Sequence, residues 1–463
     1  MRHFDLVVIG AGSGNSIPGP ALVSEQILVV DDGVHFGGTC LNVGCIPTKM
    51  FVHPAEIAHE VAEARHVLNA TSGEIRYDWQ GIRDRVFGRI DAISEGGEEY
   101  RASGEPNISL LREQVRLTSE HELESASGER ITFDRLVIAT GSRPRELAAL
   151  PLGDRIHTND TILRLDNQPE RLAVIGGGAI ACEFAAMFAG LGTQVVQIHR
   201  SELLRGVDDE VRACFTEAAK RRWGLHLGTE VTRAVTTADG VTLTLSNGDE
   251  LTVDHVLVAA GRVVNTDRLG TQELGLDHRE NGALVVDEQQ RVLRGGEPVA
   301  GIWAVGDSAN TAQLKHVANH EARVAVQSIL HDLGRAEAPS GVLGPIPLVV
   351  FSSPQIATFG RTLAEAHDDG LDAVEARCDY GATAWGWALA DSEHFVKIVA
   401  ERGSGTLLGA HIIGPDAGIL LQPLVQAASF GQSVHGLARG QYWPHPAATE
   451  IVENALLKLE EQL

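Results

Sequence analysis

The sequence is poor in positive charge. It contains 38 Lys and Arg against 62 Asp and Glu, which gives a formal net charge of −24. Nucleic acids and anionic membrane surfaces are bound through clusters of basic residues, so this balance disfavours both as main partners. We therefore expect no nucleic-acid or membrane partner, and an enzyme that acts on small molecules.

Long apolar runs and a disulfide framework are missing as well. No segment reaches the roughly 18 consecutive apolar residues that a transmembrane helix needs. The first residues, MRHFDLVVIG, lead directly into a strand pattern and lack the layout of a signal peptide. These features predict a cytoplasmic protein. In that reducing compartment, the odd number of five cysteines argues against structural disulfides.

Three of the cysteines, Cys182, Cys214 and Cys378, are isolated in the sequence. A zinc site needs several Cys or His residues at ligand spacing, and these three offer none. We interpret them as buried structural thiols and expect no metal site.

The chain is long enough for several domains, and the order of its elements indicates their class. Apolar strands alternate with amphipathic helices and glycine turns, which predicts an α/β fold. Strand–glycine–helix patterns at 6–15 and 172–181 predict two Rossmann-like dinucleotide-binding domains. After about residue 338, antiparallel strand patterns at 346–351 and 394–414 precede helices, so the last part is predicted to be α+β. Asn247 and Gly248 predict a hairpin turn.

The first glycine turn follows an apolar strand. Its residues are Gly10, Gly12, Ser13 and Gly14. Glycines here allow a tight turn and close approach of a pyrophosphate, and the N-terminus of the next helix directs its amide dipoles at that anion. Asp31 ends the following strand, where an acid binds a ribose hydroxyl. Asn15 replaces the third glycine and Pro18 shortens the helix, so a plain loop is the alternative to a nucleotide site.

Two cysteines stand five positions apart in GGTCLNVGCIPTK, residues 37–49. Cys40 and Cys45 can form a disulfide if the chain folds back between them, which Gly44 permits. Pro47 suits the first turn of a helix, so Cys45 is expected at a helix N-terminus that stabilises its thiolate. The alternatives are a pair of inert core cysteines or half of a zinc site.

The second glycine turn carries a different signal for its ligand. It contains Gly176, Gly178 and Ile180. A site specific for NAD would end the next strand with an acid, whereas His199, Arg200 and Arg205 follow it here. These cations suit a 2′-phosphate, which predicts NADPH, and the alternative is a basic surface turn.

A histidine and a carboxylate stand close together near the C-terminus, in WPHPAATE at 443–450. Reduction of a disulfide expels a thiolate that needs a proton, and an imidazole supplies one near neutral pH. Glu450 can orient the ring of His445. A loop histidine without a catalytic role is the alternative.

GGTCLNVGCIPTK resembles the active-site peptide of the class I pyridine-nucleotide disulfide oxidoreductases, the family of glutathione reductase and dihydrolipoamide dehydrogenase. The resemblance implies FAD and NADPH as cofactors, Cys45 against the flavin and Cys40 as the thiol that attacks the substrate disulfide. It also implies that Lys49 lies near the flavin and pairs with Glu183. The family is homodimeric, and each site receives its His445–Glu450 pair from the other subunit.

Further stretches match the flavin-binding motifs of this family. GIWAVGDS, at 301–308, resembles the second flavin motif, in which Asp307 holds the ribityl chain. Other residues implied to bind the cofactors are Gly38, Thr39, Thr140, Gly141 and Gly261. The implied FAD domain is split, because the NADPH domain is inserted into it. The expected segments are FAD-binding 1–148, NADPH-binding 149–265, FAD-binding or central 266–337, and dimerisation 338–463.

Several segments resemble the mycothione reductase branch of the family. They include GSGNSI (12–17), LKHVANHEARV (314–324) and ARGQYWPHPAATEIVENALL (438–457). The implied substrate is mycothiol disulfide, which has no free carboxylate or amine. The absence of Lys and Arg between Arg2 and Lys49 agrees with such a substrate.

The sequence leaves other functions and roles open. Dihydrolipoamide dehydrogenase or another reductase of small disulfides is an alternative, and a non-catalytic flavoprotein redox sensor is one from a different class. Trp385, Trp387 and Trp443 are interpreted as stacking on sugar rings or as interface core. Ala179 stands where family members often carry an aromatic residue over the nicotinamide pocket.

Overall fold

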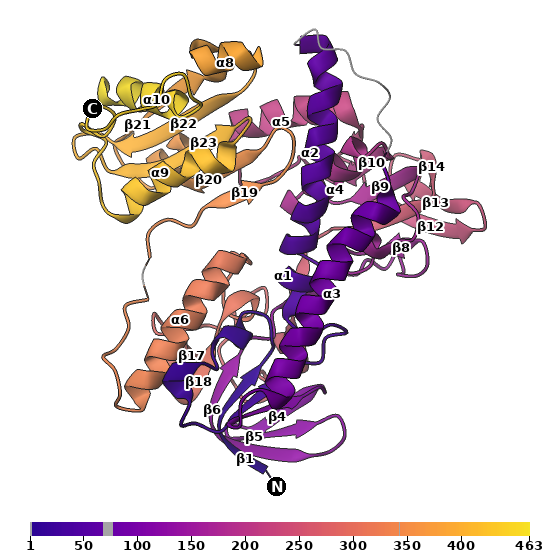
Figure 1. Ribbon diagram of the computed structural model, residues 1–463, viewed down its shortest axis with the longest axis vertical. Helices are drawn as coiled ribbons and strands as arrows, with labels where there is room; N and C mark the ends of the chain where they lie inside the picture. Colours follow the sequence, from indigo (N-terminus) through magenta and orange to yellow (C-terminus); the bar gives the residue numbers. More distant parts are fainter. Residues whose placement is uncertain (1, 68–76, 342) are drawn as a thin grey trace.

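The protein is described by a computed structural model that covers residues 2–67, 77–341 and 343–463. Two units built on parallel sheets follow each other along the long axis, and a unit built on an antiparallel sheet lies beside the upper one (Figure 1). The predicted class, α/β units followed by an α+β unit, is confirmed. None of the helices within those ranges is both long enough and apolar enough to cross a membrane.

The lower unit contains strands from two distant parts of the chain. Its main sheet has the order β17-β18-β6-β1-β2-β3, and β1 pairs in parallel with β2 and β6. The strands are β1 (Arg2–Ile9), β2 (Ile27–Val30), β3 (Ile108–Leu111), β6 (Arg130–Ile138), β17 (Arg291–Arg294) and β18 (Glu297–Ala304). A hairpin of β4 (Val115–Ser119) and β5 (Glu122–Ser125) extends β6. Apolar strands such as β2 are buried along their whole length, as parallel strands covered on both faces require.

The second unit is the insertion between those two parts. Its parallel sheet has the order β11-β10-β9-β15-β8. The strands are β8 (Ile156–His157), β9 (Arg171–Ile175), β10 (Gln194–His199), β11 (Gly224–Leu227) and β15 (His255–Val258). The helices are α4 (Ala179–Gly190) and α5 (Asp209–Arg222). The predicted hairpin is confirmed, because β13 (Gly240–Leu245) pairs with β14 (Glu250–Val253) and Gly248 has a φ of 92°. The remaining strand of that small sheet is β12 (Val231–Thr237).

The chain crosses between the two units twice, at one place. The outgoing strand β7 (Ser142–Pro144) and the returning strand β16 (Arg262–Val264) form an antiparallel pair. Asn265 reinforces the crossing, since its side-chain amide donates a hydrogen bond to the carbonyl of Thr140 at 2.9 Å. The two crossings therefore hold each other in position.

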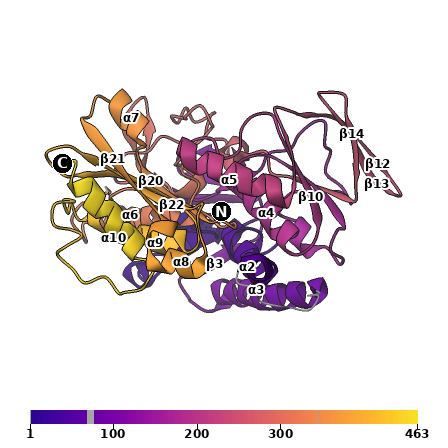
Figure 2. The same ribbon diagram turned by 90° about the horizontal axis from the view of Figure 1, so that it is seen from above.

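The C-terminal unit is an antiparallel sheet of order β19-β20-β23-β22-β21. Its strands are β19 (Leu348–Val350), β20 (Ile356–Gly360), β21 (Ala373–Asp379), β22 (Phe395–Glu401) and β23 (Leu407–Ile413). Its helices are α7 (Leu363–Asp368), α8 (Ala384–Leu389), α9 (Ala417–Ser429) and α10 (Glu450–Glu460). Helix α9 packs against β20 and β23, and α10 against β21 and β22 (Figure 2).

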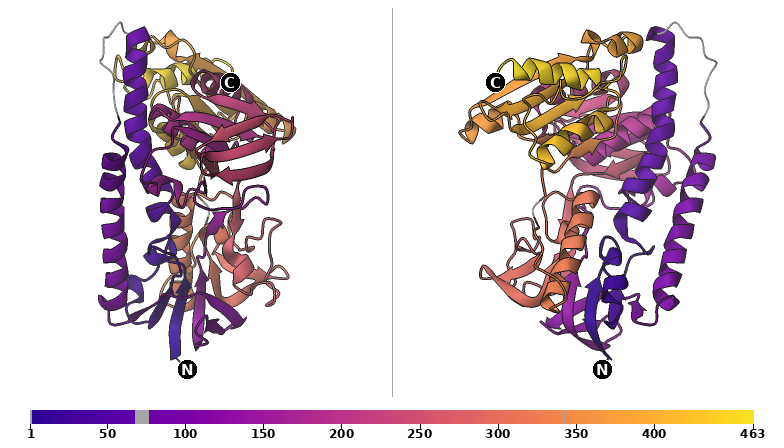
Figure 3. Two further views of the ribbon diagram at one scale, coloured as in Figure 1. Left: turned by 90° about the vertical axis from the view of Figure 1, so that its right-hand side faces the viewer. Right: turned by 60° about the vertical axis from the view of Figure 1, so that its left-hand side comes forward.

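Two long helices, α2 (Cys45–Val67) and α3 (Trp79–Ser103), run side by side along the molecule (Figure 3). Aromatic packing fixes α2 against α3 and the second unit: the ring centroids of Phe51 and Trp79 are 5.1 Å apart, and those of Trp79 and Phe188 are 5.5 Å apart. Burial of each such ring contributes about 2 kcal/mol. The short helix α1 (Gly38–Asn42) precedes α2, and α6 (Lys315–Asp332) covers the lower sheet.

The helix expected after the first glycine turn is absent from the described chain. Only two 3-10 turns follow, η1 (Gly14–Ser16) and η2 (Pro20–Leu22), because Pro18 and Pro20 remove amide donors that a helix would need. Arg101 of α3 secures this loop instead. Its guanidinium donates to the side chain of Asn15 at 2.7 Å and to its carbonyl at 2.8 Å. The expectation of a helix dipole at this turn was therefore wrong.

Candidate active site

The two cysteines of the predicted redox pair lie at the junction of two helices. Cys40 belongs to α1, and Cys45 is the first residue of α2, as expected. Gly44 allows the fold-back between them, since a Cβ there would lie 2.9 Å from the carbonyl oxygen of Thr39. Cys40 is half-buried and Cys45 is exposed, and in this structure the predicted disulfide partners are both free thiols. The side chain of each cysteine is the largest influence on the pKa of the other, so the two sulfurs lie close together.

The neighbouring thiol has opposite effects on the two sulfurs. The Cys40 side chain is the largest influence that lowers the pKa of Cys45; the charge of Lys49 acts in the same direction and burial opposes them, which gives a pKa of about 7. The Cys45 side chain raises the pKa of Cys40 above its usual range, and burial adds to the rise. Near pH 7 about half of Cys45 in the reduced pair is therefore thiolate, while Cys40 keeps its proton.

The lysine one helical turn after Cys45 is paired with a buried acid. Lys49 Nζ lies 2.5 Å from Glu183 Oε2, and the amide of Phe351 donates to Glu183 Oε1 at 2.9 Å. Burial raises the pKa of Glu183, while Lys49 and the Phe351 amide act in the opposite direction. The pair joins α2 to α4 and holds a positive charge close to the redox pair.

The first glycine turn lies directly against the segment that leads to Cys40. Gly10 has a φ of +106°, and a Cβ on it would come 2.2 Å from the Ala139 carbonyl oxygen. A Cβ on Gly38 would come 2.5 Å from the Cα of Gly12. Asp31 is buried beside the turn, where it accepts the Ala11 amide at 2.9 Å and pairs with Arg112. Backbone alone thus lines the space between Gly12 and Gly38.

Other predicted flavin residues gather at the ends of β6 and β18. The hydroxyl of Ser142 donates to Asp307, and Arg262 donates to that hydroxyl at 2.6 Å. The buried Oγ1 of Thr140 has no hydrogen-bond partner among the described residues. Such a hydroxyl is rarely left unsatisfied, so together with the glycine-lined turn it fits a bound dinucleotide such as FAD.

The remaining predicted cofactor residues surround this site. Thr39 is exposed on α1, and Lys49 is half-buried on α2. Gly141 and Gly261 have φ angles of +65° and +113°, one on each crossing segment.

The second glycine turn has the helix that the first one lacks. Gly176 has a φ of +141°, and α4 begins directly after Gly178. His199 ends β10 and covers this turn, since a Cβ on Gly177 would come 2.3 Å from its ring. Ile180 in the first turn of α4 is exposed.

The end of β10 is basic. Burial lowers the pKa of His199, and the charges of Arg200 and Arg205 lower it further. Both arginines are exposed, and Arg200 lies 3.9 Å from Glu230. The strand therefore presents cations where an NAD site would present an acid.

His445 and Glu450 form the predicted pair. His445 Nδ1 lies 2.7 Å from Glu450 Oε1, and the side chain of His445 is 70% exposed. Among the described residues, no hydrogen bond or ion pair joins this pair to Cys40 or Cys45. Helix α10, which begins at Glu450, lies on the C-terminal sheet, away from α1 (Figure 1). A single chain therefore does not bring the imidazole to the sulfurs.

Lys315 was not predicted as a site residue. Its Nζ donates to Ser13 Oγ at 2.9 Å, and its charge lowers the pKa of Cys40 against the larger opposing effects. It lies in the segment LKHVANHEARV, and the resemblance of that segment to the family was the available signal.

The structure agrees only in part with the expectations for the three isolated cysteines and for the tryptophans. Cys182 and Cys378 are buried, but Cys214 is only half-buried, because it lies on α5 at the edge of the C-terminal unit, beside Glu393. Trp443 packs against the core of the C-terminal unit and donates to the Ala438 carbonyl at 2.7 Å, whereas Trp387 is 70% exposed.

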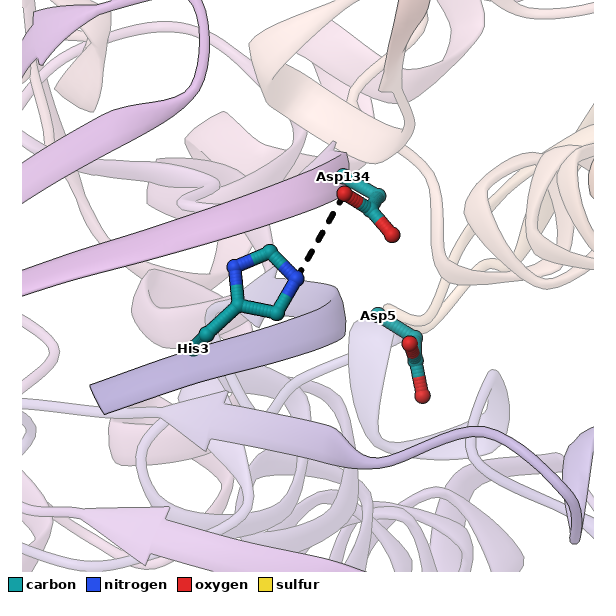
Figure 4. Close-up of side chains that lie close together, drawn as sticks. All are labelled: His3, Asp5 and Asp134. Carbon is teal, nitrogen blue, oxygen red and sulfur yellow. Dashed lines mark ion pairs between the residues drawn. The ribbon is translucent and has the colours of Figure 1, made fainter.

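One surface cluster has a composition that could attract a cation. His3 and Asp134 face each other from β1 and β6 at 3.5 Å, with Asp5 beside them (Figure 4). Asp5 already accepts the Gln26 amide at 2.7 Å, and His3 Nδ1 lies 3.0 Å from the Thr132 hydroxyl. These protein partners account for the cluster, so we assign it no ion.

Comparisons with known proteins agree over the whole chain. Residues 4–322 match the family described as pyridine nucleotide-disulphide oxidoreductase, and residues 346–456 match its dimerisation domain. The chain is 43% identical over 470 residues to mycothione reductase of Mycobacterium tuberculosis, covering 99% of this chain and 100% of the relative. It is 31% identical over 469 residues to dihydrolipoyl dehydrogenase of Geobacillus stearothermophilus, covering 97% and 95%.

Two solved structures share the fold. LpdA from Mycobacterium tuberculosis superposes with a TM-score of 0.83 at 24% identity, covering 99% of this chain and 100% of that chain. The HOCl-induced flavoprotein disulfide reductase RclA from Escherichia coli superposes with a TM-score of 0.83 at 22% identity, covering 98% and 99%.

Proposed function

Because the chain belongs to the pyridine nucleotide-disulphide oxidoreductase family, we propose that Cys40 and Cys45 are the redox pair with which it reduces a small disulfide. The enzyme uses FAD and NADPH. The observation that carries the proposal is the juxtaposition of two thiols at the junction of α1 and α2, where the thiolate is favoured on Cys45.

Bound FAD supplies the reduction of the Cys40–Cys45 disulfide with the two electrons of NADPH. Lys49, one helical turn from Cys45 and held by Glu183, stabilises the thiolate that results. The turns at Gly10–Gly14 and Gly38 and the hydroxyls near Asp307 are proposed to bind FAD. We assign segments 1–148 and 266–337 to the flavin domain, 149–265 to the NADPH domain and 338–463 to dimerisation.

Substrate reduction then needs groups of the protein and one proton from solvent. The imidazole takes the proton of Cys40, and the Cys40 thiolate attacks one sulfur of the substrate disulfide, forms a mixed disulfide and expels the first thiolate, which takes that proton from the imidazolium. The Cys45 thiolate then attacks the Cys40 sulfur, restores the internal disulfide and expels the second thiolate, which takes its proton from solvent. Two electrons leave the enzyme and two thiols form.

Cys40 requires a base, because its pKa is raised and Cys45 holds the charge. The exposed imidazole of His445, oriented by Glu450, has the chemistry of that base. We propose a homodimer in which His445 of the partner subunit faces Cys40. The match of residues 346–456 to the dimerisation domain supports this arrangement.

Mycothiol disulfide is the proposed substrate. The 43% identity to mycothione reductase supports it, as does the lack of Lys and Arg between Arg2 and Lys49, which suits a substrate without carboxylates. Arg200 and Arg205, the cations that follow His199 at the end of β10, support NADPH over NADH. We propose that the enzyme works in the cytoplasm, a reducing compartment in which cysteines persist as thiols.

A panel of disulfides tests the substrate proposal. Purified holoenzyme is assayed with NADPH and with NADH against mycothiol disulfide, glutathione disulfide and lipoamide. We expect the highest kcat/KM with NADPH and mycothiol disulfide. Faster turnover of lipoamide with NADH would instead assign the chain to dihydrolipoamide chemistry.

A further inference from the structure

The first glycine turn lacks its usual source of positive charge. In dinucleotide-binding folds, the helix that follows the turn places roughly half a positive charge beside the diphosphate. Here the turn is followed by the three-residue η1, which is too short to form a macrodipole, whereas the second glycine turn is followed by the 12-residue α4. A flavin diphosphate at the first turn therefore needs a counter-charge from elsewhere.

Lys315 is the cation at this turn that no described acid neutralises, since Arg101 and Arg112, which also border the turn, are paired with Glu105 and Asp31. Its Nζ donates to Ser13 Oγ at 2.9 Å, and Ser13 Oγ in turn donates to Asn319 Oδ1 at 3.3 Å. Lys315 is half-buried, and none of the ion pairs found within the described ranges includes it. A partly desolvated ammonium without an acid is unfavourable, so the site lacks an anionic partner.

Lys315 does not stabilise the helix to which it belongs. It is the first residue of α6, an 18-residue helix, and that helix has no acidic residue in its first turn and no side-chain cap. A lysine at this position repels the positive end of the helix dipole. The Lys315 ammonium and the positive N-terminus of α6 thus lie together near Ser13. They repel each other unless an anion lies between them.

We propose that the Lys315 ammonium neutralises the FAD diphosphate at the first glycine turn, in place of the helix N-terminus that this turn lacks. The proposal rests on the use of FAD and on the assignment of this turn to it, and is independent of the identity of the disulfide substrate. Gly38 and Gly12 are in van der Waals contact, and the Lys315 charge acts on Cys40, so the same ammonium lies near both the cofactor turn and the segment of Cys40.

The test measures FAD binding without NADPH or any disulfide. Apoprotein of wild type, Lys315→Gln, Lys315→Arg and the surface control Lys220→Gln is titrated with FAD, and flavin fluorescence gives Kd at low and high salt. Lys220 is exposed and, within the described part of the chain, is paired only with Glu217. Loss of a charge-assisted contact should raise the Kd of Lys315→Gln about 10- to 100-fold. Lys315→Arg and the control should stay within about threefold of wild type.

Salt separates a charge effect from a structural one. The wild-type Kd should rise with ionic strength, and the rise should be shallower in Lys315→Gln. The thermal midpoints of the apoproteins show whether each is folded, and Lys315→Met is a second neutral variant that keeps the aliphatic stem. An unchanged Kd in a folded neutral variant overturns the proposal. So does a weaker Kd with an unaltered salt dependence, because it would assign Lys315 only to the placement of Ser13.

Discussion

The thiols of Cys40 and Cys45 lie close enough that each is the largest influence on the pKa of the other, and this proximity favours the thiolate on Cys45. In the reduced enzyme about half of Cys45 is thiolate at its pKa of about 7, and the fraction rises above that pH. The Cys40 side chain has a larger effect on this pKa than Lys49, whose charge acts in the same direction.

Replacement of Cys40 by alanine should therefore raise the pKa of Cys45 above about 7. The pH dependence of alkylation of Cys45 by iodoacetamide measures it, in a Cys214→Ser background that removes the half-buried competing thiol. At pH 7 the variant should react more slowly than the parent, because less thiolate is present. An unshifted pH midpoint of alkylation would show that the Cys40 side chain does not determine the protonation state of Cys45.

Removal of one member of the pair between α2 and α4 should lower stability. Lys49→Met leaves the Glu183 carboxyl buried without its cation, which we expect to reduce the free energy of unfolding by about 2 kcal/mol. The urea midpoint of each single variant and of Lys49→Met/Glu183→Gln measures this. The double variant should lose less than the sum of the singles, since it leaves no unpaired charge. Additive losses would mean that the two groups do not interact.

Loss of the imidazole should slow disulfide turnover without affecting reduction of the bound flavin by NADPH. We expect His445→Gln to lower kcat by about 10²- to 10⁴-fold, and Glu450→Gln to lower it less. Stopped-flow reduction of the flavin is the control, because that step does not involve His445. Equal loss in both steps would argue for a structural role.

Subunit mixing tests whether His445 acts across the dimer. Cys40→Ser and His445→Gln homodimers are expected to be nearly inactive, and they are co-refolded or exchanged in equal amounts. In a mixed dimer, one site combines an intact Cys40 with His445 of the partner subunit, so about a quarter of all sites should regain activity. If no activity returns although mixed dimers form, the partner arrangement is wrong.

Coenzyme choice should depend on the cations after β10. Arg200→Ala removes one such cation, and we expect KM for NADPH to rise about tenfold or more while KM for NADH changes little. Arg233→Ala, an exposed position on β12, is the matched control. Equal changes in KM for both coenzymes would show that Arg200 supports the turn without binding the 2′-phosphate.

The parts of the fold that were predicted correctly are those in which single residues restrict the local backbone conformation. The start of α2 at Cys45 follows from Pro47, and the hairpin follows from Asn247 and Gly248. Lys49 and Glu183 could be paired only through the family resemblance, because they are 134 positions apart.

The errors have physical causes. The helix after the first glycine turn was expected from the motif, but Pro18 and Pro20 outweigh that pattern, and Arg101 of a distant helix secures the loop. The link between Lys315 and Ser13 spans 302 positions, and it depends on how α6 is placed against η1. Periodicity within a short window carries no information about such a placement.

The pairing of β7 with β16 brings both ends of the inserted unit together. An insertion whose ends adjoin can be exchanged for another of the same architecture without stretching the host sheet. The inserted unit, which we propose binds NADPH, could therefore be exchanged as one piece. Any graft would have to retain an acid at the position of Glu183, because that carboxylate is the one the host helix α2 uses to hold Lys49.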